Sequence, residues 1–387
     1  MTERVTRRSF INTATLAGAA IPANLMAMDP EASPQSAAAG STAAFRIAVA
    51  GLVHPHAGDV LKMLRRARAD IQVVGVSEPI KEVRADFVSK GVNPALVFPD
   101  EAEMIEKTHP QAVVIYSTTY DHRSAVEVAA RYGVHAMMEK PLAVSMADAH
   151  AMASAARKGN IHLLVNFVTN WYASNAAAYE LLHDGSIGAA RKIIVKDGHS
   201  SPRPLSGPYG WIVDPKLNGG GALFDFGCYG ANLSTWLMDG QRPTSVTAVT
   251  QTFKPDIYPR VDDEATIILT YPKAQAILQP SWNWPFDRKD MEVYGETGYA
   301  ITVGTDALRV RKTGQPEEQV SLAGLPPPQN DPLLYLKAVV DGVTPSGPAS
   351  LAINMIATEI LDAARESART GKMISLVNSP GKTAARH

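Results

Sequence analysis

The residues Met138-Glu139-Lys140-Pro141 end an apolar run, Val134 to Met138, that has the length and composition of a buried strand. Parallel α/β sheets bind their ligands at the carboxyl ends of the strands, so Lys140 stands where such proteins build active sites. Two further segments accompany it in the chain. They are Phe45-Arg46-Ile47-Ala48-Val49-Ala50-Gly51, about 90 residues upstream, and Gly219-Gly220-Gly221-Ala222-Leu223-Phe224-Asp225-Phe226-Gly227-Cys228-Tyr229, downstream.

In that order and spacing, the three segments resemble the Gfo/Idh/MocA family of oxidoreductases. The resemblance implies an α/β protein with an N-terminal Rossmann dinucleotide-binding domain, residues 45–165. It also implies a C-terminal α+β domain, residues 166–387, in which a large, mainly antiparallel open sheet holds a sugar-like substrate. The length of 387 residues is sufficient for two such domains.

The charge balance argues against a nucleic-acid partner. The chain has 37 Lys and Arg residues against 38 Asp and Glu residues, so it has no excess of positive charge to neutralise phosphates. Its single cysteine, Cys228, excludes an internal disulfide and a cysteine-rich zinc site. We expect Cys228 to be a small buried apolar residue.

Residues 1–44 read as a targeting segment and linker. Thr6-Arg7-Arg8-Ser9-Phe10-Ile11 matches the twin-arginine export pattern, and a weakly apolar stretch to Ala27 follows it. That stretch is too short and too polar for a membrane span, so we expect no stable membrane anchor. The twin-arginine route carries folded proteins, and the pattern predicts a periplasmic or otherwise exported enzyme with its cofactor already bound.

The loop after the first strand departs from the expected glycine pattern. It reads Gly51-Leu52-Val53-His54-Pro55-His56-Ala57-Gly58, with Val53 where a second glycine normally lets the backbone approach phosphate. We expect Gly51, Val53 and Gly58 to lie along the cofactor and a helix N-terminus to face its pyrophosphate. His54 and His56 either contact the cofactor or cap the loop. A metal site is not expected, because no third ligand is evident nearby.

Further cofactor contacts are expected from the ends of later strands. Glu78 follows the second strand, and a carboxylate there accepts hydrogen bonds from the adenosine ribose, which favours NAD over NADP. Ser117, Thr118 and His122 stand in place of a family motif on the nicotinamide side. Glu139 and Lys140 complete the predicted contacts to the cofactor.

The downstream segment supplies the predicted catalytic pair. We expect Gly219 to Gly221 to be a flexible lead into one helix, in which Asp225, Tyr229, Asn232 and Trp236 share a face. Asp225 and Tyr229, four residues apart, would point at the same substrate hydroxyl. Many relatives have Asp-x-Gly-x-His here. With Tyr229 in place of the histidine, this segment resembles that of the branch that contains glucose–fructose oxidoreductase and the dimeric dihydrodiol dehydrogenases. Lys140 would have its pKa lowered beside bound NAD⁺ and would stabilise the Tyr229 phenolate, with Asp225 orienting the pair. Which of Lys140 and Tyr229 accepts the proton stays open.

The remaining segments suggest the substrate half. Closely spaced strand-like runs between Ala189 and Val303 predict one large antiparallel sheet, which family members use to form homodimers or homotetramers. Asn170, Trp171, Tyr172 and Trp211 could contact a carbohydrate, together with Asp225 and Tyr229. Three functions remain possible: a sugar oxidoreductase, a redox-neutral NAD-dependent glycoside hydrolase, and a sugar-binding protein without catalysis. The three predicted catalytic residues argue against the last.

Overall fold

The computed structural model describes residues 44–65, 68–200, 202 and 205–377. The predicted export signal and linker lie, apart from Ala44, outside these residues. Within the described part of the chain, no helix combines the length and the apolar character that crossing a bilayer requires.

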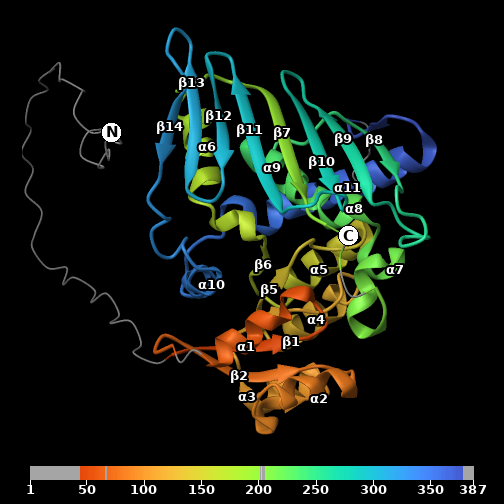
Figure 1. Ribbon diagram of the computed structural model, residues 1–387. Helices are drawn as coiled ribbons and strands as arrows, with labels where there is room; N and C mark the ends of the chain where they lie inside the picture. The colour runs from red at the N-terminus through yellow and green to blue at the C-terminus, as the bar shows by residue number, and fades with distance from the viewer. Residues whose placement is uncertain (1–43, 66–67, 201, 203–204, 378–387) are drawn as a thin grey trace, which may run out of the picture. The chain divides into compact units, whose positions relative to one another are not determined.

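The N-terminal half forms a six-stranded parallel sheet in the order β3-β2-β1-β4-β5-β6 (Figure 1). Its strands are β1 Phe45–Ala50, β2 Ile71–Ser77, β3 Val97–Phe98, β4 Ala112–Ile115, β5 His135–Glu139 and β6 Leu163–Asn166. Its helices are α1 Gly58–Arg65, α2 Lys81–Ser89, α3 Glu101–Thr108, α4 His122–Arg131 and α5 Met146–Lys158. The strand order reverses direction between β1 and β4, so the loops after these two strands diverge and leave a crevice between them.

The C-terminal half forms a nine-stranded sheet in the order β14-β13-β12-β11-β7-β10-β9-β8-β15, antiparallel except for the β7/β10 pair. Its strands are β7 Ala190–Gly198, β8 Ser245–Gln251, β9 Glu264–Thr270, β10 Gln275–Ser281, β11 Arg288–Gly295, β12 Gly298–Val303, β13 Ala307–Lys312, β14 Glu318–Ser321 and β15 Ile374–Ser375. The predicted α/β fold, a Rossmann sheet followed by a mainly antiparallel sheet, is therefore confirmed.

Helices cover one face of the large sheet. Figure 1 shows α9 (Gly227–Leu237) and α11 (Leu351–Thr370) on the same side of it, and α9 packs on β7 and β10 while α11 packs on β8. The other helical segments are η2 Pro55–Ala57, η3 Pro94–Leu96, η4 Val168–Trp171, α6 Ala173–His183, η5 Gly207–Val213, α7 Pro215–Asn218, α8 Ala222–Asp225, α10 Pro332–Val340 and η6 Gly347–Ala349.

Helix α11 also connects the two sheets. The Asp362 carboxylate accepts a hydrogen bond from the amide of Met146 at 2.7 Å, at the start of α5. The Arg365 guanidinium donates to the carbonyl of Val144 at 3.1 Å and to that of Gly219 at 2.9 Å. These contacts fix the end of the Lys140 loop against the glycine run of the other half.

The expected single helix around Asp225 and Tyr229 is two helices. Helix α8 ends at Asp225 and α9 begins at Gly227, with a bend at Phe226. Asn232, which was expected on the same face, donates instead to the carbonyl of Pro348 at 2.8 Å and to Oδ1 of Asn354 at 3.1 Å. The prediction of one continuous face was therefore wrong, and only Asp225 and Tyr229 of that face come near Lys140.

The glycine run before α8 is tightly packed rather than a flexible lead. Gly221 lies against Asp262, whose carboxylate accepts hydrogen bonds from the amides of Gly221 at 3.1 Å and Leu223 at 2.7 Å and so caps the helix that carries Asp225. A Cβ atom added at Gly221 would lie 1.8 Å from the Asp262 carbonyl oxygen.

We expect Gly221→Ala to lower the free energy of unfolding by about 1–3 kcal/mol or more, because backbone must move to relieve the overlap. The matched control is Gly220→Ala, whose Cβ would meet only the movable ring of Phe224, at 3.0 Å. Denaturant unfolding of the two variants checks this. Equal stability of the two would contradict the packing role of Gly221.

Candidate active site

Two cavities open between the halves of the molecule. The first, here called the lysine cavity, has a volume of about 770 Å³, and the second, the glycine cavity, about 610 Å³. The lysine cavity is lined by Glu139, Lys140, Asp225, Phe226 and Tyr229 together with His54, Pro55, His56, Asp59, Asn166, Val168, Trp171, Tyr172, His199, Ser200, Pro202, Ile212, Asp287, Lys289 and Pro332. All three predicted catalytic residues thus lie on one wall.

A buried ion pair forms the centre of the lysine cavity. The Lys140 ammonium, directly after β5, lies 2.5 Å from Oδ1 of Asp225 and donates to the Asp225 carbonyl at 2.9 Å. The second carboxylate oxygen, Oδ2, accepts a hydrogen bond from the indole of Trp282 at 2.9 Å. Asp225 is therefore held from both sides, and it holds Lys140 in turn.

The protonation of this pair differs from the sequence-based expectation. Burial by itself would lower the pKa of Lys140, but the Asp225 carboxylate beside it holds the pKa above its ordinary value. Burial by itself would raise the pKa of Asp225, but Lys140 and the hydrogen bonds from Lys140 and Trp282 keep it below its ordinary value. The prediction of a lowered lysine pKa is wrong for this arrangement, because it overlooked so close a carboxylate.

Tyr229 lies beside the ion pair with its ring fixed by two others. The Lys140 Nζ atom is 5.2 Å from the centroid of the Tyr229 ring, within the range of a cation–π contact. Phe167 contacts that ring edge-on at 5.3 Å between centroids, and Phe226 stacks on it at 5.9 Å. Burial raises the pKa of the Tyr229 hydroxyl well above its ordinary value, so at neutral pH the hydroxyl carries its proton.

Lys289 is a second cation on this wall. It lies on β11, with its Nζ atom 5.8 Å from the Tyr229 ring centroid and 5.7 Å from that of Phe226. Its cross-strand neighbour Asp197 is fully buried, and neither carboxylate oxygen has a hydrogen-bond partner within the described structure. Burial raises the pKa of Asp197 well above its ordinary value.

The glycine cavity lies at the crevice between β1 and β4. Gly51 adopts a φ of +83°, and a Cβ atom there would lie 2.7 Å from the backbone of Ser117, so glycine is needed for packing between the two loops. Glu78 is buried in the same cavity and accepts hydrogen bonds from the amides of Leu52 and Ile80, both at 2.8 Å. Burial raises the pKa of Glu78 although both amides oppose this. Val53 and Thr118 also line the cavity.

The two loop histidines lie on the wall of the lysine cavity, near Glu139. His54 is buried, and its Nδ1 atom accepts a hydrogen bond from the amide of His56 at 3.2 Å. His56 is half exposed, and its Nδ1 atom lies 3.1 Å from Oε2 of Glu139. Asn166 donates to the other oxygen of Glu139 at 3.0 Å. No third ligand beside His54 and His56 was expected from the sequence, and the fold supplies one, Glu139, from the end of β5.

Some of the other predicted site residues line one of the two cavities, and some line neither. Trp171 and Tyr172 line the lysine cavity. Trp211 lines the glycine cavity instead, where its indole donates to the carbonyl of Val53 at 2.9 Å. Asn170 donates to the Val165 carbonyl and lines neither cavity.

His122 and Gly58 also lie off both cavity walls. His122 is fully buried, 3.3 Å from the carbonyl of Leu142, and burial lowers its pKa to about 4. Gly58 is the first residue of α1.

Several residues on or behind the cavity wall were not predicted from the sequence. Trp282, Lys289 and Asp197 come from β-strands or strand ends of the large sheet, and Asn166 ends β6. Lys289 and Asp197 had a detectable signal, because each lies on the apolar face of its strand, where a charged residue is unusual. Only the β7/β11 register shows that they are neighbours. Trp282 has no motif around it that would distinguish it from the other aromatic residues of this half.

Two family models match the chain. A model described as "Oxidoreductase family, NAD-binding Rossmann fold" matches residues 45–167, and the "GFO/IDH/MocA C-terminal domain" matches residues 175–301. Among curated proteins, the trans-1,2-dihydrobenzene-1,2-diol dehydrogenase of Xenopus laevis is 34% identical over 161 residues, 41% of this chain and 45% of that protein. The D-apiose dehydrogenase of Paraburkholderia graminis is 37% identical over 92 residues, 24% of each chain. The chain thus matches about half or less of the length of these relatives.

Solved structures match over most of the chain. The aldose-aldose oxidoreductase of Caulobacter crescentus, complexed with glycerol, has a TM-score of 0.74 at 23% identity, covering 86% of this chain and all of that one. An inositol dehydrogenase homologue of Azotobacter vinelandii, complexed with NAD⁺, has a TM-score of 0.73 at 19% identity, covering 86% of this chain and 97% of that one. At these identities the likeness establishes the fold.

Proposed function

The chain belongs to the Gfo/Idh/MocA family of oxidoreductases, and we propose that it is an NAD-dependent dehydrogenase acting on a carbinol carbon of a sugar or sugar derivative. The observation that carries the proposal is the Lys140–Asp225 ion pair with Tyr229 beside it, on the wall of a cavity that adjoins the Rossmann crevice. Replacing a buried ion pair by apolar residues is often neutral or stabilising, so its presence on a cavity wall supports a chemical role.

The glycine cavity fits a dinucleotide. Gly51 brings the β1 loop close to the β4 loop, and residues of both loops line the cavity. A carboxylate has about four lone-pair sites, and the backbone uses two of those on Glu78. The remaining two could accept the ribose hydroxyls, and a 2′-phosphate would be repelled, which favours NAD over NADP. Bound NAD would supply the hydride acceptor for the oxidation of the substrate.

The protein's own residues handle the proton. Lys140 and Tyr229 both carry protons at neutral pH, so the wall can donate to the oxygen of a carbonyl substrate and take the proton back in the reverse direction. Asp225 positions Lys140 and keeps it charged, and its own oxygens are occupied by Lys140 and Trp282. The proton-transferring group that we assign is the Tyr229 hydroxyl, and Tyr229 supports placing the chain in the branch with glucose–fructose oxidoreductase.

A carbohydrate fits the polar, aromatic lining of the lysine cavity. Trp171 and Tyr172 offer ring faces to sugar C–H groups, and Asn166 and Lys289 offer hydrogen bonds. The D-apiose dehydrogenase among the relatives acts, by its name, on a sugar. We extend that substrate class to this chain.

We also propose export and self-association. The twin-arginine pattern at Arg7-Arg8 supports export to the periplasm, where the cofactor would be retained and regenerated within each turnover. On the face of the large sheet opposite α9, the partly exposed residues Ile268, Ile277 and Ile194 form a row across neighbouring strands. Such an apolar row supports a homodimer or homotetramer that covers this face.

We expect NAD, and not NADP, to co-purify with the full chain at close to one molecule per chain. An exported enzyme meets no pool of free cofactor, and tight binding is therefore required. Acid denaturation followed by chromatography of the released nucleotide measures this, and a panel of sugars and aryl glycosides then tests the native protein for reduced-nicotinamide absorbance. Stoichiometric NADP would refute the role of Glu78, and release of aryl alcohol without net reduction would favour the glycoside hydrolase.

A further inference from the structure

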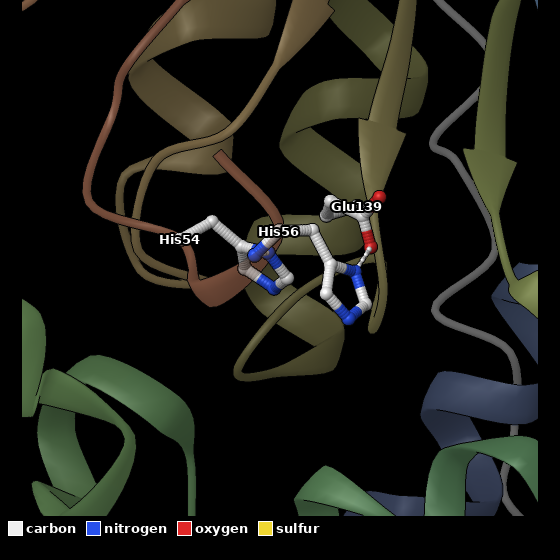
Figure 2. Close-up of side chains that lie close together, drawn as sticks. All are labelled: His54, His56 and Glu139. Atoms are coloured by element: carbon white, nitrogen blue, oxygen red, sulfur yellow. Dashed lines mark hydrogen bonds and ion pairs between the residues drawn. The ribbon is translucent and has the colours of Figure 1, made fainter. Parts of the chain in front are cut away.

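Two imidazoles and one carboxylate converge on the wall of the lysine cavity. His54 and His56 come from the loop between β1 and α1, and Glu139 comes from the end of β5 (Figure 2). One ligand atom from each residue can be chosen so that all three lie within 4.8 Å of one another. The loop carries this His-Pro-His sequence where a dinucleotide-binding loop usually carries glycine. The departure from that pattern therefore brings two imidazoles to the cavity wall beside Glu139.

We propose that His54, His56 and Glu139 bind one divalent transition-metal ion, with Zn²⁺ as the reference ion. Two imidazole nitrogens and one carboxylate oxygen form the donor set of catalytic zinc sites and of facial-triad iron sites, both of which keep open coordination positions. Imidazole disfavours Mg²⁺ and Ca²⁺, which prefer oxygen ligands alone. Lys140 lies nearby, but Asp225 balances its charge at 2.5 Å.

The carboxylate is already oriented for such a role. Asn166 donates to Oε1 of Glu139 at 3.0 Å, which leaves Oε2 facing His56. Outer-shell hydrogen bonds of this kind fix the orientation of metal-bound carboxylates and contribute to metal affinity. The ring of His54 is likewise held, edge-on to that of His56 at 4.8 Å between centroids (Figure 2).

Closing the site requires a small movement. Ligand atoms that lie about 2.1 Å from one ion can be at most about 4.2 Å apart, so the widest separation in the cluster must shorten. The His56 side chain is 45% exposed and can turn towards the ion by exchanging its contact with Glu139 for coordination. His54 would exchange the amide hydrogen bond at Nδ1 or turn its ring.

The ion would be open to the lysine cavity, since all three ligands line it. Its remaining positions would take hydroxyl or carbonyl oxygens of the substrate and orient them towards Lys140 and Tyr229. This assignment of the open positions rests on the proposed function, whereas metal binding itself does not.

Titration of the chelator-treated full chain with Zn²⁺ alone, followed by calorimetry and elemental analysis, tests the site. The chain carries ten histidines, so any purification tag must be free of histidine. We expect one Zn²⁺ per chain. His56→Gln and Glu139→Gln should each weaken binding by about 100-fold or more, beyond the ~10- to 100-fold that we expect for Asn166→Leu, which removes an outer-shell partner.

The matched control is His199→Gln, which removes a histidine that lines the same cavity outside the cluster and should bind Zn²⁺ as the wild type does. Absence of Zn²⁺ binding to the wild type, or equal weakening by His199→Gln and His56→Gln, would overturn the proposal. Released NAD is measured on the same samples. If the chain binds Zn²⁺ but holds no NAD, the metal site stands and the proposed function is refuted. If the chain holds NAD but does not bind Zn²⁺, the proposed function stands and the metal site is refuted.

Discussion

Lys140→Met is expected to lower kcat by about 10²- to 10⁴-fold or more, the range typical for loss of a proton-handling group. Methionine fills a similar volume but removes the charge that faces Asp225 at 2.5 Å and the cation over the Tyr229 ring. The measurement is steady-state turnover with the best substrate from the sugar panel, with bound nucleotide quantified in the same preparation.

The same substitution is also expected to destabilise the fold. The sequence alone suggested that Lys140 is a loop residue whose removal leaves the fold intact. In the structure both partners are buried, and breaking a buried ion pair by removing one partner costs about 3–5 kcal/mol. The free energy of unfolding should therefore fall by that amount in Lys140→Met.

The double variant Lys140→Met/Asp225→Asn separates the two effects. It removes the stranded carboxylate and keeps an acceptor for the Trp282 indole, so it should recover most of the lost stability without recovering turnover. Turnover of the single variant within a few-fold of the wild type would refute the catalytic assignment. Recovery of turnover in the double variant would show that the loss came from instability alone.

The parallel half of the fold was predictable because its strands are buried on both faces. Continuous apolar runs such as Ala112–Ile115 have a distinctive pattern, and glycine or polar residues end each of them. The bend at Phe226 was not predictable, because the four-residue spacing of Asp225 and Tyr229 fits one continuous helix that runs through Phe226. At the bend the Tyr229 amide donates to the carbonyl of Phe226, and the carbonyl of Asp225 accepts instead from the Lys140 ammonium, which is a contact between distant segments.

Site residues that belong to a sequence motif could be predicted one by one. Contacts between residues that are far apart in the chain could not. Lys140, Asp225 and Tyr229 stood out by motif, and they do converge. The meeting of His56 with Glu139 depends on the path of the β1 loop across the end of β5. The spacing along the chain does not contain that information.

Protonation was the least accessible property. Placing Lys140 near a bound cation suggests a lowered pKa, but a carboxylate at 2.5 Å has the opposite effect and is the nearer charge. Trp282, which orders that carboxylate, lies on a segment with no motif. The sign of the shift therefore required the structure.

Tyr229→Phe is expected to lower kcat by about 10²- to 10⁴-fold while bound NAD stays near the wild-type amount. Phenylalanine keeps the ring that packs between Phe167 and Phe226 and beneath the Lys140 ammonium, and removes only the hydroxyl. Because the packing is retained, the free energy of unfolding should change little, in contrast to Lys140→Met. Steady-state kinetics and denaturant unfolding on one preparation measure both quantities.

The comparison with Asp225→Asn decides which group passes the proton. Asp225 has both oxygens engaged by Lys140 and Trp282, so it acts by positioning, and its replacement should shift the pH profile of kcat by releasing the hold on the lysine pKa. The sign follows from the pair: without the carboxylate the pKa of Lys140 falls, and the lysine loses its proton at a lower pH. If Tyr229→Phe is nearly silent and Asp225→Asn is severe, the proton passes through Lys140 and Tyr229 serves as packing. If both are silent while His54→Ala or His56→Ala is inactive, the chemistry lies at the histidine loop.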